Sequence, residues 1–327
     1  MTFYIILTFA AFLLSLLGTR IVILAWRQRP AMLNARGQLH KPTPRSGGVA
    51  VVMALIICLL IADIHYAVIL AMFLLAAVSL LDDIIGVPLP VRLLVQLLAV
   101  LIVLSVVPIP VFGGWLPGWA DKAVTAMVWL WFINLFDFMD GIDGMSPTEM
   151  IGIGMGFCLI TVIVGAFPDP LSVYSLIIVA AGWGFLWWNW HPAKIFLGEV
   201  GTIPIGFLLG YMLLLASLSG YGYAAAILPA YYLSDATITL IYRAYKGKAF
   251  WGVHPDYYYQ HAVRKGRRHD TVVRYVFGVN LLLVLLATFS VLNPELAILH
   301  LAIAYMAVFM ILGFFAYTAP NPHDEPF

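Results

Sequence analysis

The chain has 327 residues, of which 63% are hydrophobic and only 10% are charged, with a formal net charge of +1. A soluble domain carries about 25% charged residues and keeps a polar exterior that this composition cannot supply. Ordinary soluble globules, disordered chains and nucleic-acid binders driven by charge are therefore excluded. The two cysteines, Cys58 and Cys158, lie in apolar runs, which excludes a disulfide framework. The composition predicts an all-α, polytopic membrane protein.

Apolar runs that could cross a bilayer follow one another along the chain, since a spanning helix needs about 20 apolar residues. The eleven candidates cover residues 2–25, 46–63, 66–81, 91–107, 121–137, 146–166, 171–189, 201–219, 223–243, 272–292 and 296–315. A short run could be re-entrant, so we expect about 10–11 transmembrane helices. The first run lacks the basic start and cleavage site of a signal peptide, so we expect a retained helix. No long linker interrupts the series, which predicts a single integral-membrane domain over residues 1–327 with a flexible tail at 316–327.

Basic residues predict the orientation, because cytoplasmic loops are enriched in Lys and Arg. If the N-terminus lies outside, the basic loops at 27–45 and 244–270 both fall on the cytoplasmic face. Of the 17 Lys and Arg residues, only Lys122 then falls on the other face. The opposite orientation would misplace nearly all of them. We therefore expect an outside N-terminus.

Carboxylates from three separated segments gather on the same predicted face. They are Asp82 and Asp83 at the end of the third run, Asp137, Asp140 and Asp143 at the end of the fifth, and Glu199 at the start of the eighth. A carboxylate in or near hydrocarbon is costly, so it is a functional candidate by default. The three-residue spacing of Asp137, Asp140 and Asp143 brings like charges close together, and they repel unless a cation binds them. Oxygen ligands without a nearby Cys favour Mg²⁺ or Mn²⁺ beside substrate phosphates, which predicts an active site on the cytoplasmic face.

Five segments in this order resemble the polyprenyl-phosphate N-acetylhexosamine-1-phosphate transferase superfamily (glycosyltransferase family 4). That superfamily includes the transferase that makes lipid I of peptidoglycan and the enzymes that initiate O-antigen and teichoic-acid chains. The segments are HKPTPRSGG (40–48), LDDIIG (81–86), NLFDFMDGIDG (134–144), FLGEVG (196–201) and the loop that opens at His254. The lead-in WNWHPAK (188–194) is most similar to the O-antigen-initiating branch.

The resemblance implies a multi-pass enzyme of the bacterial inner membrane that acts on two substrates. It would transfer HexNAc-1-phosphate from a UDP-N-acetylhexosamine to undecaprenyl phosphate with Mg²⁺, giving undecaprenyl-diphospho-HexNAc and UMP. This reaction would begin a cell-envelope glycan such as the O-antigen of lipopolysaccharide. Family members can be homodimers. The identity of the sugar, and the choice between direct attack and a covalent aspartyl intermediate, stay open.

The resemblance also implies roles for individual residues. Asp82 and Asp83 would deprotonate or position the lipid phosphate, and His254 would lie near the diphosphate as a third catalytic residue. The expected metal ligands are Glu199 and Asp140, and the spacing of the acid cluster adds Asp137 as a third. The expected substrate-binding residues are Lys41, Arg45, Asn134, Asp143 and Phe196. Among these, Lys41 would contact phosphate, Phe196 would stack on uracil, and Asp143 would lie near that base.

Three places depart from the family pattern. Glu199 stands where the family usually has an aspartate that binds the metal, and Asp137 stands where it often has asparagine. The last loop reads His254-Pro255-Asp256-Tyr257, where this branch often reads His-Arg-x-His. A misplacement of about 1 Å at such a site can reduce the rate about 10²-fold. We therefore expect either a compensating geometry, in which Asp137 takes a metal position, or a weakened homologue that binds lipid or nucleotide.

Other classes fit the residues less well. A membrane transporter would explain the many spans and Asp235 inside the ninth run. Transporter sites usually lie near the midplane, however, whereas most of these acids gather at one face. A phosphotransferase that uses CDP-alcohols would carry a long Asp-Gly-x-x-Ala-Arg signature, which the sequence lacks. The loop histidines His261 and His269 are expected to be ordinary polar residues.

Overall fold

Helices make up nearly all of the computed structural model, which describes residues 2–27, 32–33, 39–40, 43–107, 110–166, 169–248 and 256–317. The α-helices are α1 (Thr2–Arg27), α2 (Gly47–Ile61), α3 (Tyr66–Ile85), α4 (Leu89–Leu104), α5 (Gly118–Phe138), α6 (Met145–Ile163), α7 (Pro170–Asn189), α8 (Glu199–Leu218), α9 (Gly222–Ile227), α10 (Ala230–Tyr245), α11 (Tyr258–Arg264), α12 (His269–Leu292) and α13 (Ala297–Tyr317). A 3₁₀ turn, η1 (Pro294–Leu296), precedes α13. The strands β1 (Met32–Leu33) and β2 (Leu39–His40) form one short antiparallel pair, with Met32 opposite His40.

Every predicted apolar run forms helix in the structure. Within the described residues, seven helices are long and apolar enough to cross a membrane, and they are α1, α3, α6, α7, α8, α12 and α13 with its preceding turn. Two further apolar helices, α2 and α4, are shorter. The prediction of an all-helical, polytopic membrane protein is therefore confirmed.

Two details differ from the prediction. The ninth run is not one helix, because α9 ends at Ile227 and α10 begins at Ala230. Pro229 lies between them, and proline disrupts a helix interior but is tolerated at a helix start. At the other end of the chain, α13 continues to Tyr317, so the first two residues of the predicted tail are helical. Residues 318–327 lie outside the described part.

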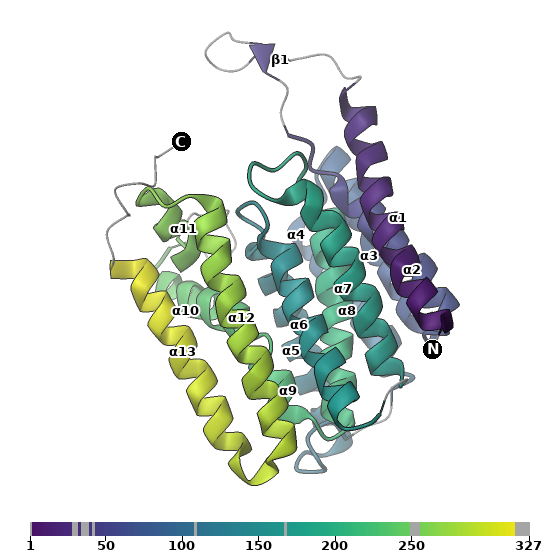
Figure 1. Cartoon of the computed structure of the whole chain (residues 1–327), viewed down its shortest axis with the longest axis vertical. Helices are drawn as coiled ribbons and strands as arrows, with labels where there is room; N and C mark the ends of the chain where they lie inside the picture. The colour runs from purple at the N-terminus through teal and green to yellow at the C-terminus, as the bar shows by residue number, and fades with distance from the viewer. Residues whose placement is uncertain are drawn as a thin grey trace.

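The bundle buries its central helices and exposes apolar side chains on its outer ones. In Figure 1, α6, α7 and α8 lie between α1–α3 on one side and α10–α13 on the other. Phe9 of α1 and Phe309 of α13 are more than half exposed, together with many neighbouring Leu, Ile and Met side chains. Such an apolar surface is unfavourable in water and favourable in lipid. Helices can lie in lipid because their backbone N–H and C=O groups form hydrogen bonds within the helix.

Hydrogen bonds between buried or half-buried polar side chains join neighbouring helices of the bundle. Glu149 in the first turns of α6 is fully buried and accepts a hydrogen bond from Asn280 Nδ2 of α12 at 2.8 Å. Asn134 of α5 donates to Gln96 Oε1 of α4 at 2.8 Å. These contacts fix neighbouring helices against one another close to the end of the bundle where the predicted site residues lie.

Candidate active site

Arg92 joins carboxylates from two of the predicted segments. The short connection after α3 allows α4 to begin at Leu89, so that Arg92 in its first turns faces Asp82. Arg92 Nη1 lies 2.9 Å from Asp82 Oδ2, and Arg92 Nη2 lies 2.5 Å from Glu199 Oε2 at the start of α8. The Val87 amide donates to Asp82 Oδ1 at 2.5 Å, whereas the neighbouring Asp83 is exposed. The structure therefore brings Asp82 and Glu199 together through one guanidinium group.

Asp137 lies in the last turn of α5, next to the start of α8. Its carboxylate accepts a hydrogen bond from the hydroxyl of Thr202, one turn after Glu199. Asp137 is also within electrostatic range of Asp82, Asp83 and Arg92. Three helices that are far apart in sequence thus place carboxylates around Arg92.

Asp140 follows in the loop between α5 and α6. Ser146 Oγ donates to Asp140 Oδ1 at 2.5 Å. Burial raises the pKa of Asp140 to about 7, despite this hydrogen bond, and the charges of Asp137 and Asp143 act in the same direction. Asp140 can therefore be neutralised near neutral pH unless a cation lies close by.

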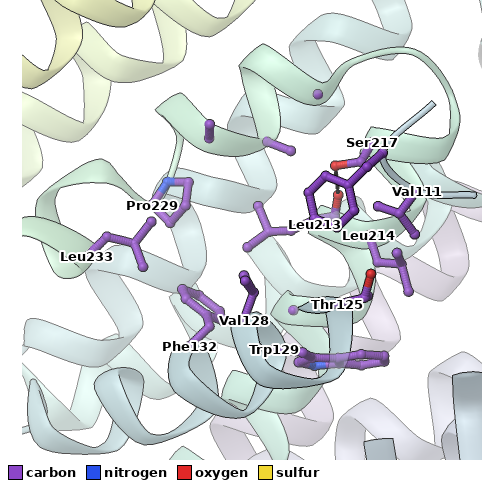
Figure 2. Close-up of a pocket in the computed structure, with 15 residues that line it drawn as sticks. Val111, Thr125, Val128, Trp129, Phe132, Leu213, Leu214, Ser217, Pro229 and Leu233 are labelled. Carbon is purple, nitrogen blue, oxygen red and sulfur yellow. Dashed lines mark hydrogen bonds between the residues drawn. The ribbon is translucent and has the colours of Figure 1, made fainter. Parts of the chain in front are cut away.

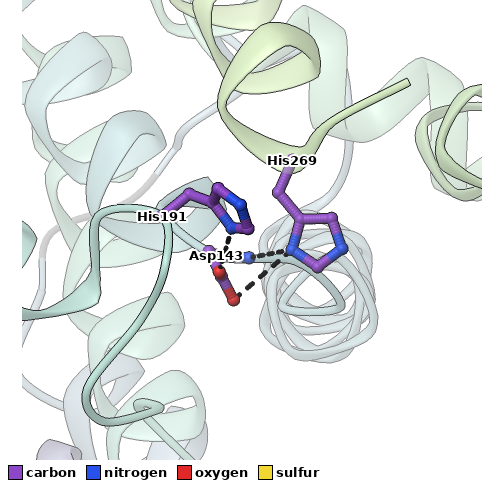
Figure 3. A group of neighbouring side chains, drawn as sticks. All are labelled: Asp143, His191 and His269. Carbon is purple, nitrogen blue, oxygen red and sulfur yellow. Dashed lines mark hydrogen bonds and ion pairs between the residues drawn. The ribbon is translucent and has the colours of Figure 1, made fainter. Parts of the chain in front are cut away.

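Asp143 lies three residues further on, between two histidines (Figure 3). His191 Nδ1 is 2.6 Å from Asp143 Oδ2, His269 Nδ1 is 3.4 Å from Asp143 Oδ1, and the Ala193 amide donates to Oδ2 at 3.1 Å. Burial alone would raise the pKa of Asp143, but the hydrogen bonds from His269, His191 and the Ala193 amide outweigh it and lower the pKa below the usual value. Asp143 is thus an ionised carboxylate, and each of its two oxygens contacts a histidine side chain.

The segment between α7 and α8, residues 190–198, connects the separate parts of the site. At its start, Asn189 Oδ1 accepts from the Gly144 amide, and Asn189 Nδ2 donates to the Ile195 carbonyl, both at 2.8 Å. At its end, the Phe196 amide donates to the Pro44 carbonyl at 2.8 Å. Gly198 has φ +73° and passes so close to Arg45 that a Cβ atom would lie 1.9 Å from the Arg45 carbonyl oxygen. This segment therefore holds Phe196 and Glu199 against the loop that carries Arg45.

The last predicted loop docks through a buried acid. Asp235 of α10 accepts hydrogen bonds from the amides of Tyr258 and Tyr259 at 2.8 and 3.2 Å, at the start of α11. Tyr259 in turn reaches the loop after α5, since a Cβ atom on Gly141 would lie 2.2 Å from the Tyr259 hydroxyl. Asp235 therefore binds the start of α11 and positions this helix beside the site. This structural role explains a buried acid inside the ninth run, which was the best sequence argument for a transporter.

Two predicted residues lie outside the part of the chain that the structure describes, Lys41 and His254. The structure adds three residues that the sequence reasoning did not select, Arg92, His191 and His269. The expectation that His269 is an ordinary polar loop residue is wrong, because the start of α12 places it against Asp143. The sequence does contain a signal for Arg92 as a site residue. Arg92 lies near the start of the run that follows Asp82-Asp83, and therefore at the same predicted membrane depth as the acids. His191 had only its place in the WNWHPAK segment, and nothing in that spacing indicates Asp143 as its partner.

The predicted metal ligands offer oxygen donors that suit a hard divalent cation such as Mg²⁺. Asp137 and Glu199 are within electrostatic range of each other, and Arg92 balances only part of the local negative charge. Within the described residues, however, Glu199, Asp137 and Asp140 do not form a group with all ligand atoms within 4.8 Å. The group that meets this criterion is Asp143, His191 and His269. The donor set thus fits Mg²⁺ chemically, with the ligands further apart than in a closed metal site.

An apolar groove follows α5, the helix that carries Asp137 in its last turn. It consists of two cavities that share Val128, one of about 430 Å³ beside α4 and one of about 300 Å³ beside α8 and α9. Figure 2 shows the second cavity, where Val128 and Phe132 of α5 lie near Pro229 and Leu233. The first cavity ends at Asn134 and Phe138, on either side of Asp137 in the sequence. We refer to these two cavities together as the α5 groove.

These features define an integral-membrane protein with a polar, acid-rich site at one end of its helical bundle, beside an apolar groove. The chain matches the model of glycosyl transferase family 4 over residues 65–217. It is 26% identical, over 71% of both chains, to the "Probable undecaprenyl-phosphate N-acetylglucosaminyl 1-phosphate transferase" of Bacillus subtilis (strain 168). It is 29% identical to the phospho-N-acetylmuramoyl-pentapeptide-transferase of Desulforapulum autotrophicum, over 51% of this chain and 57% of that one.

A further phospho-N-acetylmuramoyl-pentapeptide-transferase, from Syntrophus aciditrophicus, is 31% identical over 32% of this chain and 34% of its own. The chain thus matches between about a third and somewhat over half of the length of these pentapeptide transferases. These matches support the resemblance of the chain to the polyprenyl-phosphate N-acetylhexosamine-1-phosphate transferase superfamily. The matched region contains Asp82, Asp137 and Glu199, which the fold brings together around Arg92.

Proposed function

We propose that this chain transfers HexNAc-1-phosphate from a UDP-N-acetylhexosamine to undecaprenyl phosphate, releasing UMP. The observation that carries this proposal is the pairing of Asp82 and Glu199 with Arg92, with Asp137 within electrostatic range and one end of the apolar α5 groove at Asn134 and Phe138. Such an arrangement suits an acceptor with a long apolar chain and a phosphate head. The name of the Bacillus subtilis relative supports the same acceptor and the same kind of transfer. The reaction would begin a cell-envelope glycan, such as O-antigen, at the bacterial inner membrane.

The transfer requires a nucleophile, a neutralised diphosphate and an in-line approach. An oxygen of the lipid phosphate attacks the β-phosphorus of the donor, and the bond from that phosphorus to the bridging oxygen breaks, so that UMP leaves. Asp82 is held by Arg92 and the Val87 amide, whereas Asp83 is exposed. We therefore assign to Asp83 the task of keeping the lipid phosphate dianionic, and to Asp82 the positioning of Arg92.

Charge neutralisation falls to Arg92 and to a divalent cation. Glu199, Asp137 and Asp140 would hold Mg²⁺ or Mn²⁺, and such an ion supplies charge stabilisation for phosphate oxygens when bound. Arg92 offers a planar pair of donors, which suits phosphate as well as carboxylate. Lys41, Arg45 and His254 would contribute from the loops that flank the same site.

The donor nucleotide would lie on the other side of Asp140. Phe196 provides an aromatic face for uracil, and the ionised Asp143 provides a fixed acceptor for its N–H group. Asn134 is bonded to Gln96 and lies at the end of the α5 groove, where it would orient the acceptor's head group. The sugar is a HexNAc, and N-acetylglucosamine is the first donor to test.

A second candidate function is binding of lipid or nucleotide with weak turnover. The observation that favours it is the direct ion pair of Arg92 with Glu199, at the position proposed for a metal ligand. The variant Asp137→Asn distinguishes an active transferase, in which Asp137 binds the metal, from a weakened binding protein. Asparagine keeps a hydrogen-bond acceptor for Thr202 and removes the negative charge. If Asp137 takes a metal position, Mg²⁺ affinity should fall at least about 10-fold. An unchanged Mg²⁺ titration would count against compensation by Asp137.

Turnover by the purified protein tests the proposed function. The protein in detergent would be given undecaprenyl phosphate, Mg²⁺ and a panel of UDP-HexNAc donors, and released UMP would be measured. We expect UMP that depends on both lipid and metal, and that is lost in Asp82→Asn and Asp83→Asn. Absence of UMP with every donor, from a folded protein that binds Mg²⁺, would contradict the proposed function.

A further inference from the structure

The outer face of α7 carries two adjoining cavities on a side of the bundle that the proposed reaction does not use. One, of about 560 Å³, lies between α1 and α7 and is lined by apolar side chains such as Phe9, Phe12 and Leu176. The other, of about 590 Å³, lies between α6, α7 and α12 and is lined by Trp187, Trp190 and Phe277 among others. Trp183 lines both cavities. We refer to the two together as the α7 groove.

The α7 groove is long and has rigid walls. Trp190, just after the end of α7, lies fourteen residues beyond Leu176 in the sequence. This separation corresponds to about 21 Å at 1.5 Å per residue. The helices beside it are fixed to one another, because Ser15 Oγ of α1 donates to the Ala181 carbonyl at 2.8 Å and Trp188 Nε1 donates to the Leu16 carbonyl at 2.9 Å. The groove therefore matches an extended apolar chain with a head group at one end.

Positive charge lies only at one end of the α7 groove. Of the side chains that line its two cavities, Lys194 and Arg274 are the charged ones, and both lie in the cavity of Trp190. The carboxylate beside them, Asp270, is shared between Arg274 at 2.8 Å and Arg268 at 3.1 Å, so that cations are in excess. The side chain of Arg274 is 65% exposed, and its guanidinium lies 6.0 Å from the centre of the Trp190 ring. Trp and Lys or Arg together are typical of the head-group level of a bilayer.

We propose that the α7 groove binds an anionic phospholipid of the surrounding bilayer. Its phosphate lies between Lys194 and Arg274, and one acyl chain extends past Trp183 toward Leu176. One leaflet contributes about 15 Å of hydrocarbon, so a groove of about 21 Å accommodates a chain together with its head group. The residues of the α7 groove come from α1, α6, α7, the segment 190–198 and α12, whereas the carboxylates come from α3, α5 and α8 and the loop after α5. No residue that lines the groove is one of these carboxylates.

Native mass spectrometry of the purified chain with added lipids tests this site. The lipids are phosphatidylglycerol, which is anionic, phosphatidylcholine, which is zwitterionic, and undecaprenyl phosphate. The double variant Lys194→Ala, Arg274→Ala removes the proposed head-group site, and both side chains are exposed, so the fold should persist. The matched control is Lys246→Ala, Lys248→Ala, which removes two exposed cations from the loop after α10. Thermal unfolding of each variant checks that it is folded, and Arg274→Gln alone provides a milder change.

We expect the wild type to retain phosphatidylglycerol in preference to phosphatidylcholine. The double variant should lose about 25-fold in apparent affinity for phosphatidylglycerol, because each cation near a membrane surface contributes about a 5-fold preference. The control should bind as the wild type does. Equal binding of the two phospholipids by the wild type, or unchanged binding by the folded double variant, would overturn the proposal. Displacement of phosphatidylglycerol by undecaprenyl phosphate, with the same dependence on Lys194 and Arg274, would also overturn it and assign the groove to the acceptor.

Discussion

At the scale of single residues, the site depends on one guanidinium group that serves two carboxylates. Arg92 reaches Asp82 and Glu199 with different nitrogens, and the Arg92 side chain is only 22% exposed. Charge-assisted hydrogen bonds of this kind are stronger than neutral ones, and their strength depends on the planar, forked geometry of arginine. Arg92 thus links α3, α4 and α8 at the point where we propose that phosphates bind.

Arg92→Lys tests this geometry. A lysine offers one compact charge and cannot hold both carboxylates at once, so we expect kcat/KM for UMP release to fall about 10²-fold. The control is Arg20→Lys on the exposed face of α1, which should leave kcat/KM unchanged. Equal kcat/KM values for Arg92→Lys and the wild type would show that only the positive charge at position 92 is needed. The simultaneous contact with Asp82 and Glu199 would then have no role in the rate.

The residue scale also shows how far sequence reasoning reaches. Asp82, Asp137 and Glu199 were predicted to converge, because each ends or begins a span on the same expected face, and the structure does bring them together. The pairing of His191 with Asp143 could not be predicted, since it depends on the path of residues 190–198 and not on any helical period. Arg92 was used only for orientation, because its partners lie on other helices.

At the scale of elements, the segment between α7 and α8 organises the nucleotide side of the site. It is bonded to the loop after α5 through Asn189, His191 and Ala193, and to the loop before α2 through Phe196. Long-range contacts of this kind hold Asp143 and Phe196 in a fixed relation. We therefore expect the binding of uridine nucleotides to depend on residues that need not touch the nucleotide.

His191→Ala and His191→Asn separate positioning from folding. The amide nitrogen of asparagine can take the place of Nδ1, so we expect His191→Asn to retain most of the affinity for UMP. His191→Ala removes one of the two donors to Asp143 Oδ2 and leaves the Ala193 amide. We therefore expect a loss of about 10-fold in UMP affinity with little change in the thermal midpoint. Calorimetric titration with UMP measures the affinity. This test requires a measurable UMP affinity in the wild type. If both variants then have the wild-type affinity for UMP, His191 has no positioning role.

The attachment of α11 to α10 gives a second prediction at this scale. Asp235→Asn turns an amide N–H₂ toward one of the two backbone donors at Tyr258 and Tyr259, which leaves that donor unsatisfied. We expect a loss of about 2 kcal/mol in stability and faster trypsin cleavage after Arg264. Thermal unfolding and limited proteolysis measure these effects, with Asp63→Asn between α2 and α3 as a control. Unchanged proteolysis would show that Asp235 does not hold α11.

At the scale of the whole molecule, the prediction of a polytopic helical bundle succeeded because apolar runs are an intrinsic property of the sequence. All eleven runs form helix, and the one difference inside a run follows from Pro229. The two apolar grooves could not be predicted, because they arise where helices distant in sequence fail to fill the space between them. Their positions underlie both proposals, since the α5 groove ends at Asn134 and Phe138 beside Asp137 in the sequence and the α7 groove ends at exposed cations.

Val128 lies in both cavities of the α5 groove and provides a test at this scale. Val128→Trp narrows the groove, so we expect KM for undecaprenyl phosphate to rise about 10-fold while KM for the UDP-sugar stays the same. The matched control is Val162→Trp on α6, where the side chain is also exposed but lines neither groove. A rise in the KM of both substrates, or of neither, would count against the α5 groove as the acceptor site.

The central claim is that a phosphosugar, and not the sugar alone, moves to the lipid. The most direct measurement uses a UDP-HexNAc donor labelled at the β-phosphorus, with undecaprenyl phosphate, Mg²⁺ and the purified chain. We predict that the label passes into the organic-soluble lipid product and that unlabelled UMP is released in equal amount. Label that remains in the water-soluble nucleotide as UDP, while sugar moves to the lipid, would contradict the account.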